Sequence, residues 1–168
     1  IAWVLETYPK QMGELFCNLL EIQPIFNISK LAREKQNIDI SFYLGETIIF
    51  IENKVKSIAY KEQLEEYSSL YTEKAKKCIL LSLKKSTFNV NEVAGWEYLE
   101  YGKLLEQFKI ICSQNGICQY NKYLIEDYIK FMNILLEDLI PLFDIEKIQI
   151  SNLYQKDTLE NQLLNELA

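Results

Sequence analysis

Two apolar, alternating segments, 38–44 and 47–55, are separated only by Gly45 and Glu46. Isoleucine, phenylalanine and tyrosine are frequent in both segments, as is typical of β-strands. A two-residue connection that begins with glycine fits a type II′ turn, which joins antiparallel strands. The sequence therefore predicts a β-hairpin in which Leu44 faces Thr47.

The segments around this hairpin predict an α/β sandwich. A continuous apolar run at 78–83 is typical of a strand covered on both faces, and a short strand is expected around 96–99. Helical periodicity is found at 11–20, 58–71, 102–114, 120–139 and near the carboxyl end. This order of elements, α-β-β-α-β-β-α-α, predicts a mixed sheet flanked by helices.

The composition limits the chemistry. The chain has no histidine, which excludes imidazole-based triads and nearly all catalytic zinc sites. Acid–base chemistry must then come from carboxylates, lysine, tyrosine or metal-bound water. The formal net charge of −6 provides no global attraction to nucleic acid. Four cysteines without C-x-x-C spacing, and no evident signal peptide or membrane span, predict a cytoplasmic location.

The hairpin register brings charged residues together. Continued from Leu44 and Thr47, it places Asp39 directly opposite Glu52, with Lys54 on the same face. Like charges opposed in this way are destabilising, and a Mg²⁺ ion would relieve them because it binds carboxylate oxygens, phosphate and water. Lys54 would then assist the attacking water or stabilise charge on phosphorus. The alternative, a solvated polar face of the hairpin, remains open.

These residues occur in a familiar order. Asn-Ile-Asp-Ile at 37–40 and Ile-Ile-Phe-Ile-Glu-Asn-Lys at 48–54 resemble the D…E-x-K core of the PD-(D/E)XK nuclease superfamily. Gln63-Leu-Glu-Glu-Tyr67 is similar to the Q-x-x-x-Y element of its RecB-like members. Segments 2–5, 13–16, 96–101 and 125–129 resemble a bacterial branch of that superfamily. The resemblance implies a restriction-endonuclease-like fold with a central mixed four-stranded sheet. It also implies one domain, with a core over about 1–140 and a helical C-terminal extension over 141–168.

The resemblance further implies a Mg²⁺- or Mn²⁺-dependent nuclease, with DNA as the expected substrate. Asp39 and Glu52 would hold the metal, and the backbone carbonyl of Asn53 would complete the shell. Lys54 would act on the water nucleophile or the transition state. Gln63 would reach the site from the following helix.

Further candidates surround this set. Tyr67 would support the site or contact the nucleic acid, although its spacing also suits a core position. Glu14 aligns with a helix-borne acid of the superfamily, although it lies opposite the apolar stripe of its own helix. Arg33 and Lys56 flank the site as candidate phosphate contacts, or as ordinary surface charges. The motif's proline is replaced by Ile38. A binding module that keeps the fold without turnover, paired through its terminal helix with a second copy or another protein, is the alternative function.

Overall fold

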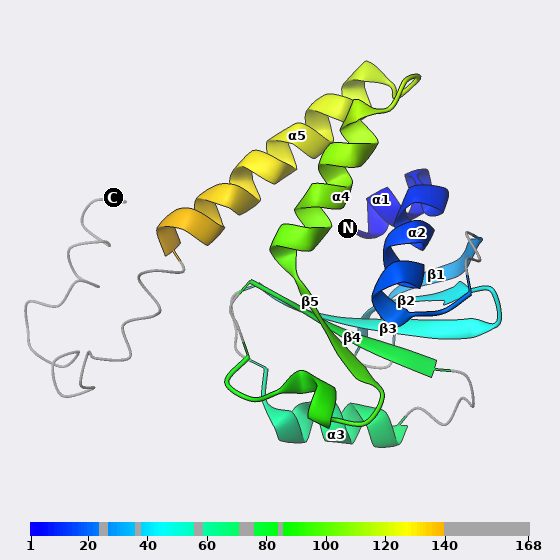
Figure 1. Cartoon of the computed structure of the whole chain (residues 1–168), viewed down its shortest axis with the longest axis vertical. Helices are drawn as coiled ribbons and strands as arrows, with labels where there is room; N and C mark the ends of the chain where they lie inside the picture. Colours follow the sequence, from blue (N-terminus) through cyan, green and yellow to red (C-terminus); the bar gives the residue numbers. More distant parts are fainter. Residues whose placement is uncertain (24–26, 36–37, 56–58, 71–75, 84–85, 140–168) are drawn as a thin grey trace, which may run out of the picture. The chain divides into compact units, whose positions relative to one another are not determined.

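A five-stranded sheet in the order β1-β2-β3-β4-β5 runs through the unit formed by Ile1–Lys130 of the computed structural model (Figure 1). Its strands are β1 (Ile28–Lys35), β2 (Ile38–Leu44), β3 (Thr47–Lys54), β4 (Lys76–Ser82) and β5 (Trp96–Glu100). The first three strands pair antiparallel, whereas β3, β4 and β5 run parallel. The structure describes residues 1–23, 27–35, 38–55, 59–70, 76–83 and 86–139. The second unit is Phe131–Ala168.

Seven helical segments are described: α1 (Ala2–Thr7), α2 (Pro9–Leu20), α3 (Lys61–Leu70), η1 (Val90–Glu92), α4 (Tyr101–Ser113), α5 (Gln119–Ile134) and η2 (Leu135–Leu139). Proline at the first position of α2 suits a helix start, because that residue needs no backbone donor. The four helices predicted between residues 11 and 139 are confirmed, whereas α1 was not predicted. The predicted terminal helix and the extension over 141–168 lie outside the described residues.

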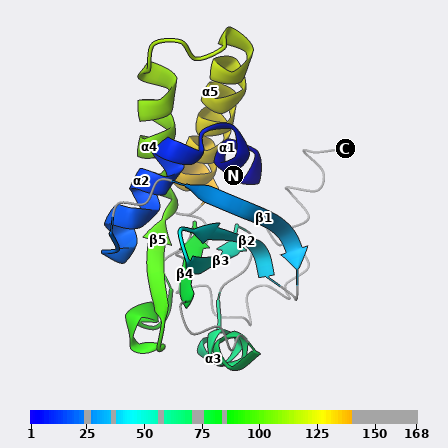
Figure 2. The same ribbon diagram turned by 90° about the vertical axis from the view of Figure 1, so that its right-hand side faces the viewer.

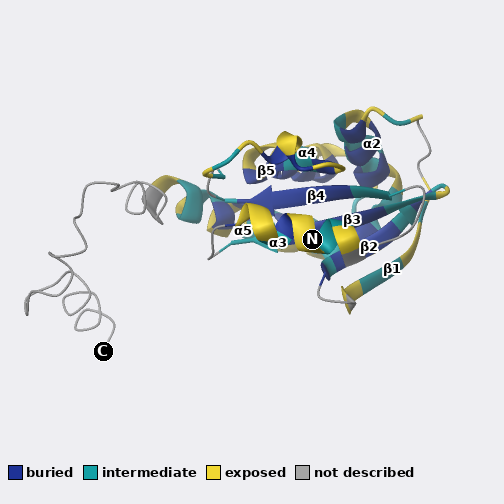
Figure 3. Cartoon of the chain, turned by 90° about the horizontal axis from the view of Figure 1, so that it is seen from below, coloured by how far each residue is buried: buried dark blue, intermediate teal, exposed yellow. Residues whose placement is uncertain are grey.

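Helices cover both faces of the sheet. Helices α1, α2 and α4 lie on one face and α3 lies on the other (Figures 1 and 2). On the first face, Phe16 of α2 stacks against Phe42 of β2 with ring centroids 5.2 Å apart. On the second face, Leu64 of α3 belongs to an apolar cluster that includes Phe50 and Trp96. The central strands are therefore the most buried part of the sheet (Figure 3).

The predicted hairpin register is confirmed. β2 and β3 pair from Leu44 with Thr47 at the turn to Ile40 with Ile51. Gly45 adopts a positive φ of 62°, which glycine tolerates without steric cost. The pairing ends at Ile40 and Ile51, one residue before the predicted Asp39–Glu52 pair, and Glu52 and Lys54 lie on one face of β3 at the end farthest from the turn.

The sheet has one strand more than the four predicted, because β1 was missed. β1 is an edge strand with largely polar residues, and Lys30 and Glu34 adopt positive φ values of 52° and 50°. Its register with β2 shifts between Ser29 and Ala32. Such a bulge breaks the period-two alternation by which a strand is recognised in a sequence. The restriction-endonuclease-like class is unchanged by this correction.

Candidate active site

The candidate site lies where β2 and β3 end their pairing. Beyond the Ile40–Ile51 pair, the Asp39 side chain reaches across to β3. Its Oδ2 accepts a hydrogen bond from the backbone N–H of Asn53, with an N···O distance of 2.7 Å. The carboxylate of Asp39 is thus oriented by the backbone of the residue between Glu52 and Lys54.

Glu52 combines deep burial with an incomplete hydrogen-bond set. The residue is only 4% exposed. Its Oε1 lies 2.6 Å from the Nζ of Lys54, whose side chain is 14% exposed. Its Oε2 is buried and, among the described residues, has no hydrogen-bond partner. An unsatisfied buried oxygen of this kind costs free energy, and a hard cation would satisfy it. The donor set therefore fits a divalent metal ion.

Burial is the largest influence on Glu52 and raises the pKa of its carboxyl above the ordinary value of 4.5. Its ion pair and hydrogen bond with Lys54 lower this pKa, and the neighbouring Asp39 carboxylate raises it again. Desolvation disfavours the charged form of an acid, as does a second negative charge nearby. Burial and Asp39 thus disfavour the charged form of Glu52, whereas Lys54 favours it.

This raised pKa predicts a pH-dependent difference between the wild type and Glu52→Gln in EDTA. The folded chain holds a proton that the unfolded chain has already released, so the contribution of Glu52 to stability falls as pH rises from 4.5 through the raised pKa. We expect the wild type to lose stability relative to Glu52→Gln over this range in urea unfolding. The exposed Glu106 provides a control, Glu106→Gln. If the stability difference between the wild type and Glu52→Gln did not change with pH, this prediction would be wrong.

Helix α3 covers the sheet face that carries Glu52 and Lys54. Phe50, on the same face of β3, packs in the apolar cluster that contains Leu64 of α3. Gln63 and Tyr67 are both half-buried on this helix. The Gln63 side-chain amide donates a hydrogen bond to the Tyr67 hydroxyl at 2.9 Å. The two residues of the Q-x-x-x-Y element thus act as a pair, and Tyr67 also packs against the apolar cluster.

Three predicted residues are not joined to this set. Glu14 is half-buried on α2, the helix that packs on the other face through Phe16. Within the described ranges, no three His, Cys, Asp or Glu side chains form a group able to hold a metal ion. Arg33 forms an exposed ion pair with Glu6, at 3.0 Å. Lys56 lies outside the described residues. The roles of Glu14, Arg33 and Lys56 therefore stay predictions.

Two tyrosines near the site were given no role in the sequence analysis, although they lie in the segments 96–101 and 125–129 that resemble the nuclease superfamily. The hydroxyl of Tyr101, on α4, donates a hydrogen bond to Oδ1 of Asn53. Tyr128, on α5, is hydrogen-bonded to Tyr101. No spacing rule indicates a contact between residues 48 positions apart. The available signals are that resemblance and the position of Tyr101 directly after β5.

The fold and this arrangement define a class of protein. A mixed sheet with helices on both faces, and two acids and a lysine at the end of its central hairpin, is a restriction-endonuclease-like fold. The chain belongs to the PD-(D/E)XK nuclease superfamily, whose family model matches residues 14–131. That range contains all the candidate site residues discussed above. Membership of this superfamily indicates nuclease activity, with a nucleic acid as the substrate. Nucleases of this superfamily generally use divalent metal ions.

No curated protein and no solved structure matches the chain. In the part of the chain that the structure describes, no helix has the length and apolar character needed to cross a membrane.

Proposed function

We propose that the chain is a Mg²⁺- or Mn²⁺-dependent nuclease that hydrolyses phosphodiester bonds, with DNA as its substrate. One observation carries this proposal: the buried Glu52 Oε2, which has no hydrogen-bond partner among the described residues and lies in a site shared with Asp39 and Lys54. A purely structural ion pair would not need a second acid beside it. A solvated polar face is disfavoured because Glu52 is buried.

Asp39 and Glu52 would hold the ion, together with the backbone carbonyl of Asn53. The N–H and C=O of a strand residue point to the same side, so the Asn53 carbonyl is directed toward the side on which Asp39 accepts its N–H. A divalent ion bound to these oxygens would lower the pKa of a water molecule and neutralise charge on the phosphate. Asp39 and Glu52 supply the two carboxylates that such an ion commonly needs.

Lys54 would stabilise the negative charge that develops on phosphorus. Its ammonium is largely buried and lies against Glu52 Oε1, which orients it toward the proposed metal ligands. A cation held in place before the reaction stabilises a developing charge without reorganisation. The Gln63–Tyr67 pair would border the site from α3, with Tyr67 close to the nucleic acid. Arg33 and Lys56 would contribute phosphate contacts.

The formal charge of −6 supports the alternative, a nuclease-fold binding module without turnover. Dimerisation or partner binding through the terminal helix, and a cytoplasmic location, remain predictions. Metal binding by calorimetry and cleavage by gel assay separate the two functions. A module would show no metal-dependent cleavage of single- or double-stranded DNA or RNA.

The direct test compares wild type, Lys54→Ala and Asp39→Ala with Mg²⁺, with Mn²⁺ and in EDTA. We expect metal-dependent cleavage by the wild type and a loss of about 10²–10³-fold in kcat for Lys54→Ala, because a preorganised charge is removed. Asp39→Ala should also weaken Mn²⁺ binding, since a ligand is lost. Equal cleavage by all three proteins would reject these roles, and Lys61→Ala, an exposed lysine paired with Glu65 on α3, serves as the control.

A further inference from the structure

Asn53 is held through both its backbone and its side chain, although its side chain points away from the face that carries Glu52 and Lys54. Its backbone N–H donates to Asp39 Oδ2 at 2.7 Å. Its side-chain Oδ1 accepts a hydrogen bond from the Tyr101 hydroxyl. A continuous chain of hydrogen bonds therefore leads from the candidate metal ligand Asp39, through Asn53, to the first residue of α4.

Tyr101 is suited to hold Asn53 rigidly. It is 1% exposed and begins α4 immediately after β5 ends, so sheet and helix both restrict it. Its hydroxyl donates to Asn53 and is also hydrogen-bonded to the hydroxyl of Tyr128. Burial, as the largest cause, raises the pKa of both phenols, which keeps them protonated and able to donate at neutral pH.

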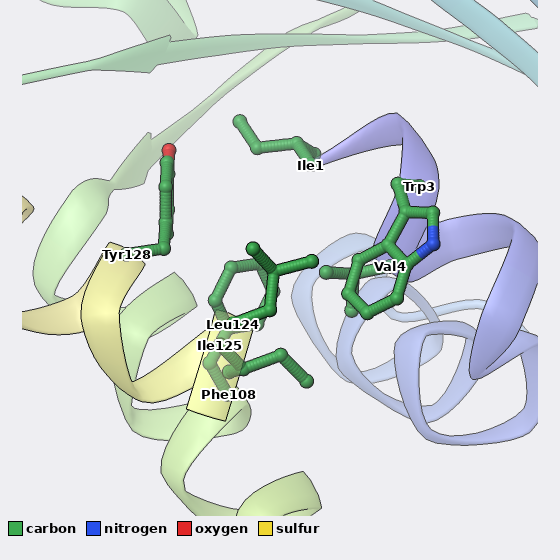
Figure 4. Close-up of a pocket in the computed structure, with 7 residues that line it drawn as sticks. All are labelled: Ile1, Trp3, Val4, Phe108, Leu124, Ile125 and Tyr128. Carbon is green, nitrogen blue, oxygen red and sulfur yellow. The ribbon is translucent and has the colours of Figure 1, made fainter. Parts of the chain in front are cut away.

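Tyr128 is itself held in place by apolar packing. Its ring lies 5.9 Å from that of Phe108 and lines a pocket of about 110 Å³ with Trp3, Val4, Leu124 and other apolar residues. In Figure 4 its hydroxyl points away from Leu124 and Ile125. The packing of the helices thus fixes the position from which the Tyr128 hydroxyl contacts Tyr101.

We propose that Tyr101, supported by Tyr128, is a positioning residue for the candidate active site. Tyr101 fixes the side chain of Asn53, and through Asn53 it orients both the Asp39 carboxylate and the Asn53 carbonyl. This inference rests on the proposed function, because those two groups are the proposed metal ligands. Groups that orient metal ligands typically change metal affinity or activity by about 10–100-fold when they are removed.

The test uses Tyr101→Phe, which keeps the buried ring and removes only the hydroxyl. We expect Mn²⁺ affinity, measured by calorimetry with the metal alone, to fall about tenfold. We also expect the Asn53 backbone N–H to exchange faster with solvent in metal-free protein. Tyr128→Phe should show the same changes to a smaller extent. Tyr8→Phe is the matched control, because that hydroxyl also has a hydrogen-bond partner, the Asn121 amide at 3.1 Å, outside this chain of contacts.

A double-mutant cycle tests the route through Asn53. If Tyr101 acts through this side chain, Tyr101→Phe should have no further effect on Mn²⁺ affinity once Asn53→Ala is present. Additive losses, or unchanged affinity and amide exchange in Tyr101→Phe, would overturn the positioning role. A wild-type protein that binds no Mn²⁺ and cleaves no nucleic acid would instead overturn the proposed function, and with it the metal-orienting role. The amide exchange would still report whether Tyr101 holds Asn53.

Discussion

Glu52→Gln is expected to abolish Mn²⁺ binding and to reduce cleavage by about 10³-fold, which corresponds to ~4 kcal/mol of transition-state stabilisation. Glutamine keeps the size of the side chain and removes the negative charge that would bind the ion. Because Glu52 is buried and its Oε2 has no partner within the described residues, this change removes a ligand with no evident substitute. Calorimetry and a gel-based cleavage assay would measure the two losses.

Stability measurements give the same prediction an independent readout. A ligand that binds only the folded state, at 100 times its Kd, adds ~2.7 kcal/mol to the free energy of unfolding. Mn²⁺ should therefore stabilise the wild type and leave Glu52→Gln unchanged. The exposed acid variant Glu106→Gln should respond like the wild type. If Glu52→Gln were stabilised by Mn²⁺ and cleaved DNA normally, Glu52 would not be a metal ligand.

Trp96→Ala is expected to have the largest effect on stability, a loss of ~3–5 kcal/mol. Trp96 is 2% exposed in the apolar cluster between the sheet and α3. Its Nε1–H also donates to the Leu64 carbonyl at 3.1 Å and to Ser68 Oγ at 2.9 Å. The substitution therefore leaves a cavity and removes the polar link between β5 and α3, which urea unfolding followed by circular dichroism would measure.

Two further variants separate these contributions. Trp96→Phe keeps much of the ring volume and removes the Nε1–H donor. Its cost should be smaller because Ser68 Oγ still donates to the Leu64 carbonyl, at 2.9 Å. Trp3→Ala replaces a tryptophan that is less buried, on α1, and should cost less than Trp96→Ala. A loss below ~1 kcal/mol for Trp96→Ala would show that α3 is not anchored through this side chain.

The parts of the fold that could be predicted are those with a regular sequence period. Strands β2 and β3 are rich in isoleucine, phenylalanine and tyrosine and flank a two-residue turn, and the helices from α2 to α5 show apolar stripes. β1 could not be predicted, because its polar residues and the shifted register between Ser29 and Ala32 disrupt alternation. α1 has only six residues, too few to show a helical period. Membership of the nuclease superfamily was likewise apparent from the ordered motifs, and the match over residues 14–131 confirms it.

The sequence by itself determined the register of the hairpin from Leu44–Thr47 to Ile40–Ile51 and placed Glu52 and Lys54 on one face of β3, because a two-residue turn and a period of two set both. Only the tertiary structure decided that Glu52 Oε2 is buried, that Asp39 accepts the Asn53 N–H, and that Tyr101 holds the Asn53 side chain. The burial of Glu52 depends on α3, which packs over the hairpin. The contact between Tyr101 and Asn53 depends on where α4 begins after β5. Such contacts join elements far apart in the chain, and their geometry follows from packing, not from local periodicity.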